Sequence, residues 1–137
     1  MSLSDVFNIA GSAMHAQSVR LNVTASNLAN AGSVHGDPTK VYRARQPVFA
    51  SFSLSLADQT GSAGVRLKGI VESGTPLNIQ YQPNHPDANE QGNVYVSNVN
   101  SVEEMVNMLS ASRSYQNSIE LMNTTKDLLL QTLSLGR

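Results

Sequence analysis

The chain of 137 residues contains no cysteine and no tryptophan. Without cysteine it can form no disulfide framework, thiol nucleophile or cysteine-based metal site. Aromatic residues make up only 5% of the sequence, which argues against a large buried pocket lined with rings. The net charge of −1 argues against a nucleic-acid partner, because nucleic-acid-binding proteins usually carry a basic patch or stripe.

Long hydrophobic runs are absent as well. No stretch approaches the roughly 18 consecutive apolar residues that a membrane-spanning helix needs. The first 22 residues lack the positively charged start and the uninterrupted apolar core of a secretory signal peptide. We therefore expect no membrane insertion and no export by the general secretory route.

The C-terminal third of the chain has a heptad pattern. Its seam residues follow one another at alternating spacings of three and four: Met105, Met108, Ser112, Tyr115, Ile119, Met122, Lys126, Leu129 and Leu133. A repeat of 3.5 residues keeps one seam of a helix facing a partner helix. Asn100 is a good N-cap, with Glu103 three residues later. We predict a helix from about Ser101 to Ser134, about 50 Å long at ~1.5 Å per residue.

The N-terminal segment has the same period. Apolar residues recur every seven positions, with smaller or polar companions between them: Phe7, Met14, Leu21 and Leu28, then Ala10, Gln17, Thr24 and Ala31. A helix from Ser4 to Ala31 with Gly32 as its stop fits this pattern. Because the segment is rich in poor helix formers such as Asn and Ser, packing has to supply its stability.

Seams at both ends of one chain indicate assembly, either with itself or with neighbours. The predicted assembly seam comprises Phe7, Met14, Leu21, Leu28, Met105, Met108, Tyr115, Ile119, Met122, Leu129 and Leu133. Three polar residues, Gln17, Asn123 and Lys126, lie in or beside it. They either fix register and partner choice or face solvent, and the pattern does not decide between these interpretations.

The middle of the chain is punctuated by glycine and proline and contains short strand-like stretches: 41–49, 65–72, 77–81 and 94–96. Their connections are too short for crossovers, so the strands should be antiparallel. We predict an α+β fold, in which long N- and C-terminal helices form a coiled-coil pair with a small irregular antiparallel β region between them. The expected units are 1–32, 33–99 and 100–137, and the first and last together form one helical domain.

The sequence gives little support for catalysis. Glu103 and Glu104 are adjacent and cannot face one another across a helix, so favourable charge at a helix N-terminus explains them better. His35 and His85 fall in loops without a second histidine at metal-ligand spacing. Neither a phosphate-binding glycine loop nor a nucleophile elbow is present. We predict no catalytic, metal-binding or cofactor-binding residue and no cofactor.

The segment 9–31 resembles the N-terminal signature of bacterial flagellar rod and hook proteins. Its core is the stretch Ser26, Asn27, Leu28, Ala29 and Asn30, called here the family motif. The segment 96–137 is similar to the C-terminus of the proximal-rod members, above all in 110–116 and 133–137. The stretches 42–45 and 69–73 match too, so the resemblance covers nearly the whole chain. Two departures are Asn100-Ser101, where Asp-Pro or Asp-Val is common, and the final Arg137, where Gln is common.

This resemblance implies a structural subunit of the proximal rod of the flagellar basal body. The terminal helices would line the export channel and transmit torque, while the β region faces outward. The chain would cross to the periplasm through the flagellar type III apparatus without a cleaved signal. Its partners would be other proximal and distal rod proteins, the MS-ring and export-gate side, copies of itself and, as an open question, peptidoglycan. The pair Phe52 and Leu56 loosely resembles an export-gate recognition pattern, although a buried strand pair explains it better.

Three alternatives remain at this stage. The chain could be another axial protein of the distal-rod or hook type. It could be a free coiled-coil adaptor, which would be helical in solution and independent of a flagellum. It could also be an enzyme such as a wall hydrolase, but that would require a paired-carboxylate, Cys or Ser site that we do not find.

Overall fold

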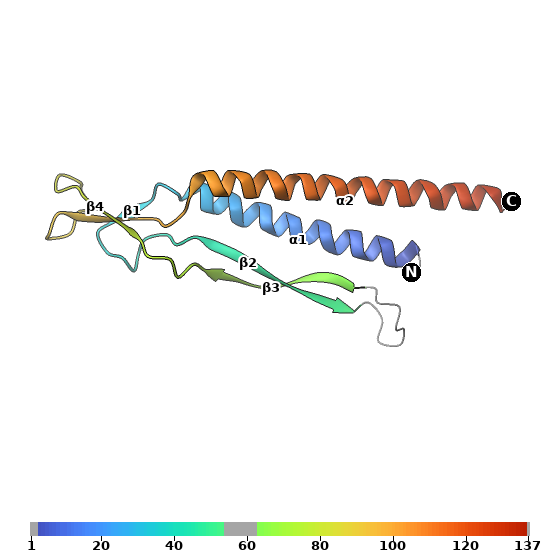
Figure 1. Ribbon diagram of the computed structural model, residues 1–137, viewed down its shortest axis with the longest axis horizontal. Helices are drawn as coiled ribbons and strands as arrows, with labels where there is room; N and C mark the ends of the chain where they lie inside the picture. Colours follow the sequence, from blue (N-terminus) through green and yellow to red (C-terminus); the bar gives the residue numbers. More distant parts are fainter. Residues whose placement is uncertain (1–2, 54–62, 137) are drawn as a thin grey trace.

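The computed structural model of the protein describes residues 3–53 and 63–136. In these ranges the elements follow in the order α1 (Leu3–Ala29), β1 (Val34–His35), β2 (Arg45–Ser53), β3 (Ala63–Glu72), β4 (Asn78–Tyr81), β5 (Asn93–Val96) and α2 (Ser101–Leu135). The molecule is elongated, with the two helices antiparallel and side by side (Figure 1). The predicted α+β fold, with a small antiparallel β region between long terminal helices, is confirmed.

The β region consists of two separate sheets. Strands β2 and β3 form a long antiparallel hairpin, and β1, β5 and β4 form a three-stranded antiparallel sheet in that spatial order. The predicted strands at 65–72, 77–81 and 94–96 correspond to β3, β4 and β5. Strand β1 was not predicted, because two residues that pair with the distant β5 leave no local pattern.

The first predicted strand, 41–49, is displaced by four residues in the structure, to Arg45–Ser53. Pro47, a residue typical of an edge strand or of a strand's end, lies inside β2, opposite Ile70. Proline is tolerated there because a two-stranded sheet leaves each strand with a free edge that needs no N–H donor. Of the pair Phe52 and Leu56, Phe52 lies in β2 and Leu56 lies outside the described residues.

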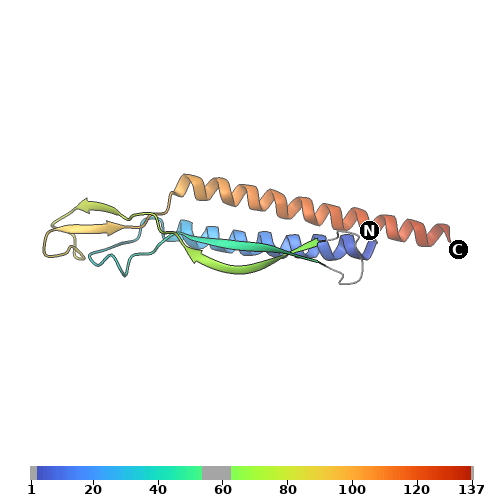
Figure 2. The same ribbon diagram turned by 60° about the horizontal axis from the view of Figure 1, so that its bottom comes forward.

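Helix α1 occupies the middle layer of the elongated part. It packs against α2 on one side and against both strands of the β2–β3 hairpin on the other, whereas the backbones of α2 and the hairpin do not approach one another closely in the described ranges. Both views show this arrangement (Figures 1 and 2). The buried residues of α1 are small or polar: Ala10, Ala16, Val23, Thr24 and Asn27. This lets its backbone approach two neighbours closely.

The N-terminus of α2 has the predicted cap. The Asn100 Oδ1 accepts hydrogen bonds from the backbone N–H groups of Val102 and Glu103, at 3.1 and 3.4 Å. Two glutamates in the first turn complement the positive end of the helix dipole. The 35-residue helix ends at Leu135, one residue later than predicted.

The last two turns of α2 extend beyond the start of α1 (Figures 1 and 2). Asn27 bonds Glu104 across the helix pair; Leu3 lies 24 positions before Asn27 and Leu128 lies 24 positions after Glu104, so α1 begins about level with Leu128. We call residues 128–135 the overhang. Four of its leucines are between 51% and 86% exposed: Leu128, Leu130, Leu133 and Leu135. Neither described helix has an apolar stretch of the length that a bilayer-spanning helix requires.

Hydrogen exchange should reveal this layering. We expect the backbone amides of 16–27, which lie between α2 and the hairpin, to exchange slowest among the helical residues. The amides of the overhang should exchange fastest, because helical hydrogen bonds without covering side chains open easily. Peptide-resolved exchange on the purified full chain measures both. Equal protection along the whole of α2 would contradict the proposed order.

Candidate assembly site

The most buried side chain of the family motif, Asn27, is the junction between α1, β2 and α2. It is 1% exposed. Its Nδ2 donates to the Arg45 carbonyl at 2.8 Å and to Glu104 Oε2 at 3.1 Å. Its Oδ1 accepts from the Arg45 N–H at 2.9 Å and from the Tyr42 hydroxyl at 2.8 Å. Both donors and both acceptor lone pairs of the amide are therefore used.

No other side chain meets these four requirements in the same space. Aspartate of the same shape lacks the two donors, and an aliphatic residue would leave several buried polar groups without partners, at about 1–3 kcal/mol each. The identity of Asn27 follows from this geometry.

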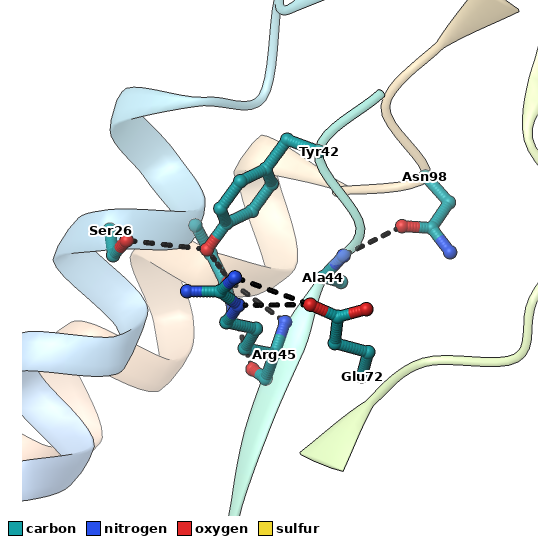
Figure 3. A network of polar contacts seen from close by, with 7 residues as sticks. Ser26, Tyr42, Ala44, Arg45, Glu72 and Asn98 are labelled. Carbon is teal, nitrogen blue, oxygen red and sulfur yellow. Dashed lines mark hydrogen bonds and ion pairs between the residues drawn. The ribbon is translucent and has the colours of Figure 1, made fainter. Parts of the chain in front are cut away.

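A second layer of polar contacts supports the junction (Figure 3). The Ser26 and Tyr42 hydroxyls lie 3.3 Å apart. The Arg45 guanidinium lies over the Tyr42 ring, 5.4 Å from its centroid, and pairs with Glu72 of β3 at 3.2 Å. Because the side chains of Arg45 and Glu72 are 48% and 56% exposed, this ion pair contributes at most about 1 kcal/mol. The Ala44 N–H donates to Asn98 Oδ1 at 2.8 Å.

The rest of the family motif ends α1. The Asn30 Nδ2 donates to the Ser26 carbonyl at 2.8 Å, and the same carbonyl also accepts the Asn30 backbone N–H at 3.2 Å, so Asn30 binds the last turn of the helix twice. Leu28 is half-buried and Ala29 is exposed. Sequence reasoning identified this motif by resemblance alone. It missed Glu104 as a partner of Asn27, since 77 positions separate them and helix capping already explained the glutamate.

The face of α2 that meets α1 differs in part from the predicted seam. Covered positions recur along it at spacings of four and three, with Asn107, Ser112 and Ser114 also half-buried beside them: Glu104, Met108, Ala111, Tyr115, Ser118, Met122, Thr125 and Leu129. Four of these belong to the predicted assembly seam: Met108, Tyr115, Met122 and Leu129. The others bring small residues to the interface, and Ala111 and Thr125 are 0% and 5% exposed.

The remaining seam residues of α2 point away from this contact. Met105, Ile119 and Leu133 are 56%, 37% and 62% exposed. In α1 the predicted seam residues are all half-buried: Phe7, Met14, Leu21 and Leu28. Their companions Ala10 and Thr24 are more deeply buried. The chain thus has a seam of small residues between its own helices and leaves large apolar residues uncovered beside it.

The described histidine, aspartate and glutamate side chains nowhere gather in a group of three that could hold a metal ion. The geometry of the junction and the seams is that of packing surfaces.

Comparison with known proteins relates these surfaces to a family. Residues 7–36 match the model of the flagella basal body rod protein family, and residues 90–135 match that of the C-terminal region of flagellar basal body rod FlgEFG proteins. The chain is 49% identical over 137 residues to the flagellar basal-body rod protein FlgC of Salmonella typhimurium strain LT2, with both chains fully covered.

Two further relatives are similar over the full length of both chains. The flagellar basal-body rod proteins FlgC of Yersinia enterocolitica and of Buchnera aphidicola subsp. Baizongia pistaciae are 50% and 37% identical over 139 residues. The two matched segments contain Asn27 and Glu104, one in each.

The junction predicts a specific pair of substitutions. Asn27→Asp removes the donors and sets a carboxylate against Glu104, and two charges about 4 Å apart repel by about 4 kcal/mol at the effective dielectric near a protein surface. We expect the free energy of unfolding to fall by about 2–4 kcal/mol. Adding Glu104→Gln should restore about half of the loss, since its amide can donate to the new aspartate.

Urea unfolding followed by far-UV circular dichroism measures these effects on the full chain. Asn22→Asp is the matched control, because Asn22 is exposed on the same helix. Equal stability of the Asn27→Asp and Asn22→Asp variants would refute the role given to Asn27.

Proposed function

Because this chain belongs to the FlgC family of flagellar basal-body rod proteins, we propose that it polymerises through its terminal helices into the proximal rod and helps to enclose the export channel. It is a structural subunit of the basal-body rod, and its place is the flagellar basal body. The proposal concerns how the subunit builds that rod and with which neighbours.

The observation that carries this proposal is the uncovered apolar side of α2. Six large apolar residues beside the helix pair are at least 37% exposed and follow one another at heptad-related spacings: Val102, Met105, Leu109, Ile119, Leu130 and Leu133. Full burial of such a side chain contributes about 1.5–3 kcal/mol. Exposed apolar residues that recur along one side of a helix are typical of an interaction surface, and here Ser112, Gln116, Asn123 and Lys126 lie between them. Neighbouring subunits are the occupants that a rod supplies.

The shape of the subunit suits torque transmission. The two helices form a straight antiparallel pair along the long axis (Figure 1), and at ~1.5 Å per residue α2 is about 50 Å long. Side-by-side contacts over that length distribute load among many weak interactions. We propose that the helical units 1–32 and 100–137 form the inner layer and that the β unit 33–99 faces outward.

The same proposal also specifies the neighbouring proteins of the subunit and its export route. The subunit would contact other proximal and distal rod proteins, the MS-ring and export-gate side, and copies of itself, with peptidoglycan as a further contact. It would reach the periplasm through the flagellar type III apparatus without a cleaved signal. Since its relatives are named as rod proteins and its junction is built from packing contacts, we propose a purely structural role without catalysis.

The exposed position Ile119 separates assembly from folding. In a strain lacking its own copy of the gene, Ile119→Asp should fold and be exported but enter basal bodies at least about tenfold less than the unchanged chain, since losing even one buried apolar contact costs more than the 1.4 kcal/mol that tenfold represents. Asn117→Asp, an exposed change on the opposite side of α2, should behave as the unchanged chain. Immunoblots of purified basal bodies and of the exported fraction measure both steps. Normal incorporation of Ile119→Asp would disprove assembly through this face.

A further inference from the structure

The start of α2 carries an exposed apolar patch on one side of the helix. Four residues form it, and they are between 55% and 67% exposed: Val102, Met105, Val106 and Leu109. Their spacing of three, one and three residues places all four on one face over two turns. The nearby residues that contact α1, Met108 and Ala111, lie on another side of α2. The chain therefore leaves these four residues, called here the α2 patch, uncovered.

Met105 is the member of the α2 patch that can change its chemistry. A thioether is oxidised by peroxides, whereas the aliphatic side chains around it are inert. Met105 is 56% exposed, and the other methionines within the described ranges, Met14, Met108 and Met122, are half-buried. The chain has no cysteine that would compete for the oxidant. Among the described residues, Met105 is therefore the methionine that a dissolved peroxide reaches most easily.

Oxidation converts this side chain from apolar to polar. Hydrogen peroxide transfers one oxygen atom to the Met105 sulfur: the S–O bond forms, the O–O bond breaks, the sulfur loses two electrons, and the second oxygen leaves as water. In the free chain the resulting sulfoxide stays hydrated, so it costs the fold little. If a neighbour covers the α2 patch, the sulfoxide has to lose its water among apolar side chains, which is unfavourable.

We propose that Met105 is a redox-sensitive site, at which sulfoxidation by a peroxide prevents the α2 patch of a free subunit from docking against a neighbouring subunit. The inference rests on the proposed function and names a modification that controls the same face of α2. The sensitive stage lies between export and docking, because a docked neighbour covers the sulfur. Methionine sulfoxide reductases reverse the change: thiols supply two electrons, and the sulfoxide oxygen leaves as water.

Oxidation kinetics test the site directly. The purified full chain and basal bodies that contain it are treated with hydrogen peroxide, and sulfoxide is measured peptide by peptide with mass spectrometry. In the free chain Met105 should oxidise at least about twofold faster than Met108 and Met122, whose side chains α1 covers. In basal bodies Met105 should oxidise at least about tenfold more slowly than in the free chain, since a neighbour shields it.

Either of two results would overturn the inference and leave the proposed function intact. One is an equal oxidation rate of Met105 in the free chain and in basal bodies, because no neighbour would then cover it. The other is oxidation of Met105 no faster than that of Met108 in the free chain. Absence of even the unchanged chain from purified basal bodies would instead overturn the proposed function.

A substitution mimics the oxidised state without any oxidant. Met105→Gln, which has a polar side chain of similar length, should keep the far-UV circular dichroism of the unchanged chain, because the position is exposed. It should enter basal bodies at least about tenfold less than the unchanged chain, since a buried polar group without a partner is costly. Normal incorporation of Met105→Gln would contradict control of docking by oxidation at this position.

The matched comparison uses two leucine variants, each with and without a pulse of hydrogen peroxide. Whatever its starting level, incorporation of Met105→Leu should be the same under both conditions, because leucine has no sulfur. Incorporation of Met122→Leu should fall by the same factor as that of the unchanged chain, since Met105 is still present. An equal loss for Met105→Leu and the unchanged chain would mean that peroxide acts elsewhere, and it would overturn the inference.

Discussion

A single buried amide holds the three parts of this protein in one arrangement. Asn27 bonds the backbone of β2 through both its donor and its acceptor, and it bonds α2 through Glu104. Leaving such a group without partners is costly. Neither α2 nor the hairpin can therefore move away from α1 at this end without breaking hydrogen bonds of the buried amide. Asn27 therefore fixes the direction of the β region at this end of the helices, and the hydrogen bond from the Val65 N–H to Ser12 Oγ, at 3.1 Å, holds the hairpin on α1 farther along.

This coupling matters because the hydrophobic core is thin. The buried apolar residues of the described chain are mostly small: Ala10, Ala16, Val23, Val41, Val94 and Ala111. Alanines bury little area and contribute little hydrophobic free energy. Directional polar contacts at the junction, and burial of the exposed leucines and methionines by neighbours, have to supply what the core does not. Under the proposed assembly, a subunit of this kind gains further stability from its neighbours.

Local patterns in the sequence predicted the elements better than their contacts. The caps and heptads located both helices to within about two residues, since 3.6-residue periodicity and capping are local properties. The side of α2 that faces α1 was predicted only in part. Two overlapping sets of positions on α2 both have spacings of three and four residues, and they share Met108, Tyr115, Met122 and Leu129. The prediction chose the set that contains Ile119 because its residues are larger and more apolar. The structure uses Ala111, Ser118 and Thr125, because small residues let two helices approach closely. Nothing local signals that Asn27 meets Glu104.

The two solutions in α2 have different uses. The small-residue seam is occupied by the chain's own α1, which leaves the large-residue seam beside it available at the same time. One helix can then hold its own subunit together and bind a neighbour with side chains that are one position apart in each heptad. We expect substitutions at Ala111 or Thr125 to act on the folded subunit, whereas under the proposed assembly substitutions at Met105 or Ile119 act on contacts between subunits. Folding and assembly are separable in this helix at the positions that the two seams do not share, because these positions lie on neighbouring sides of the helix.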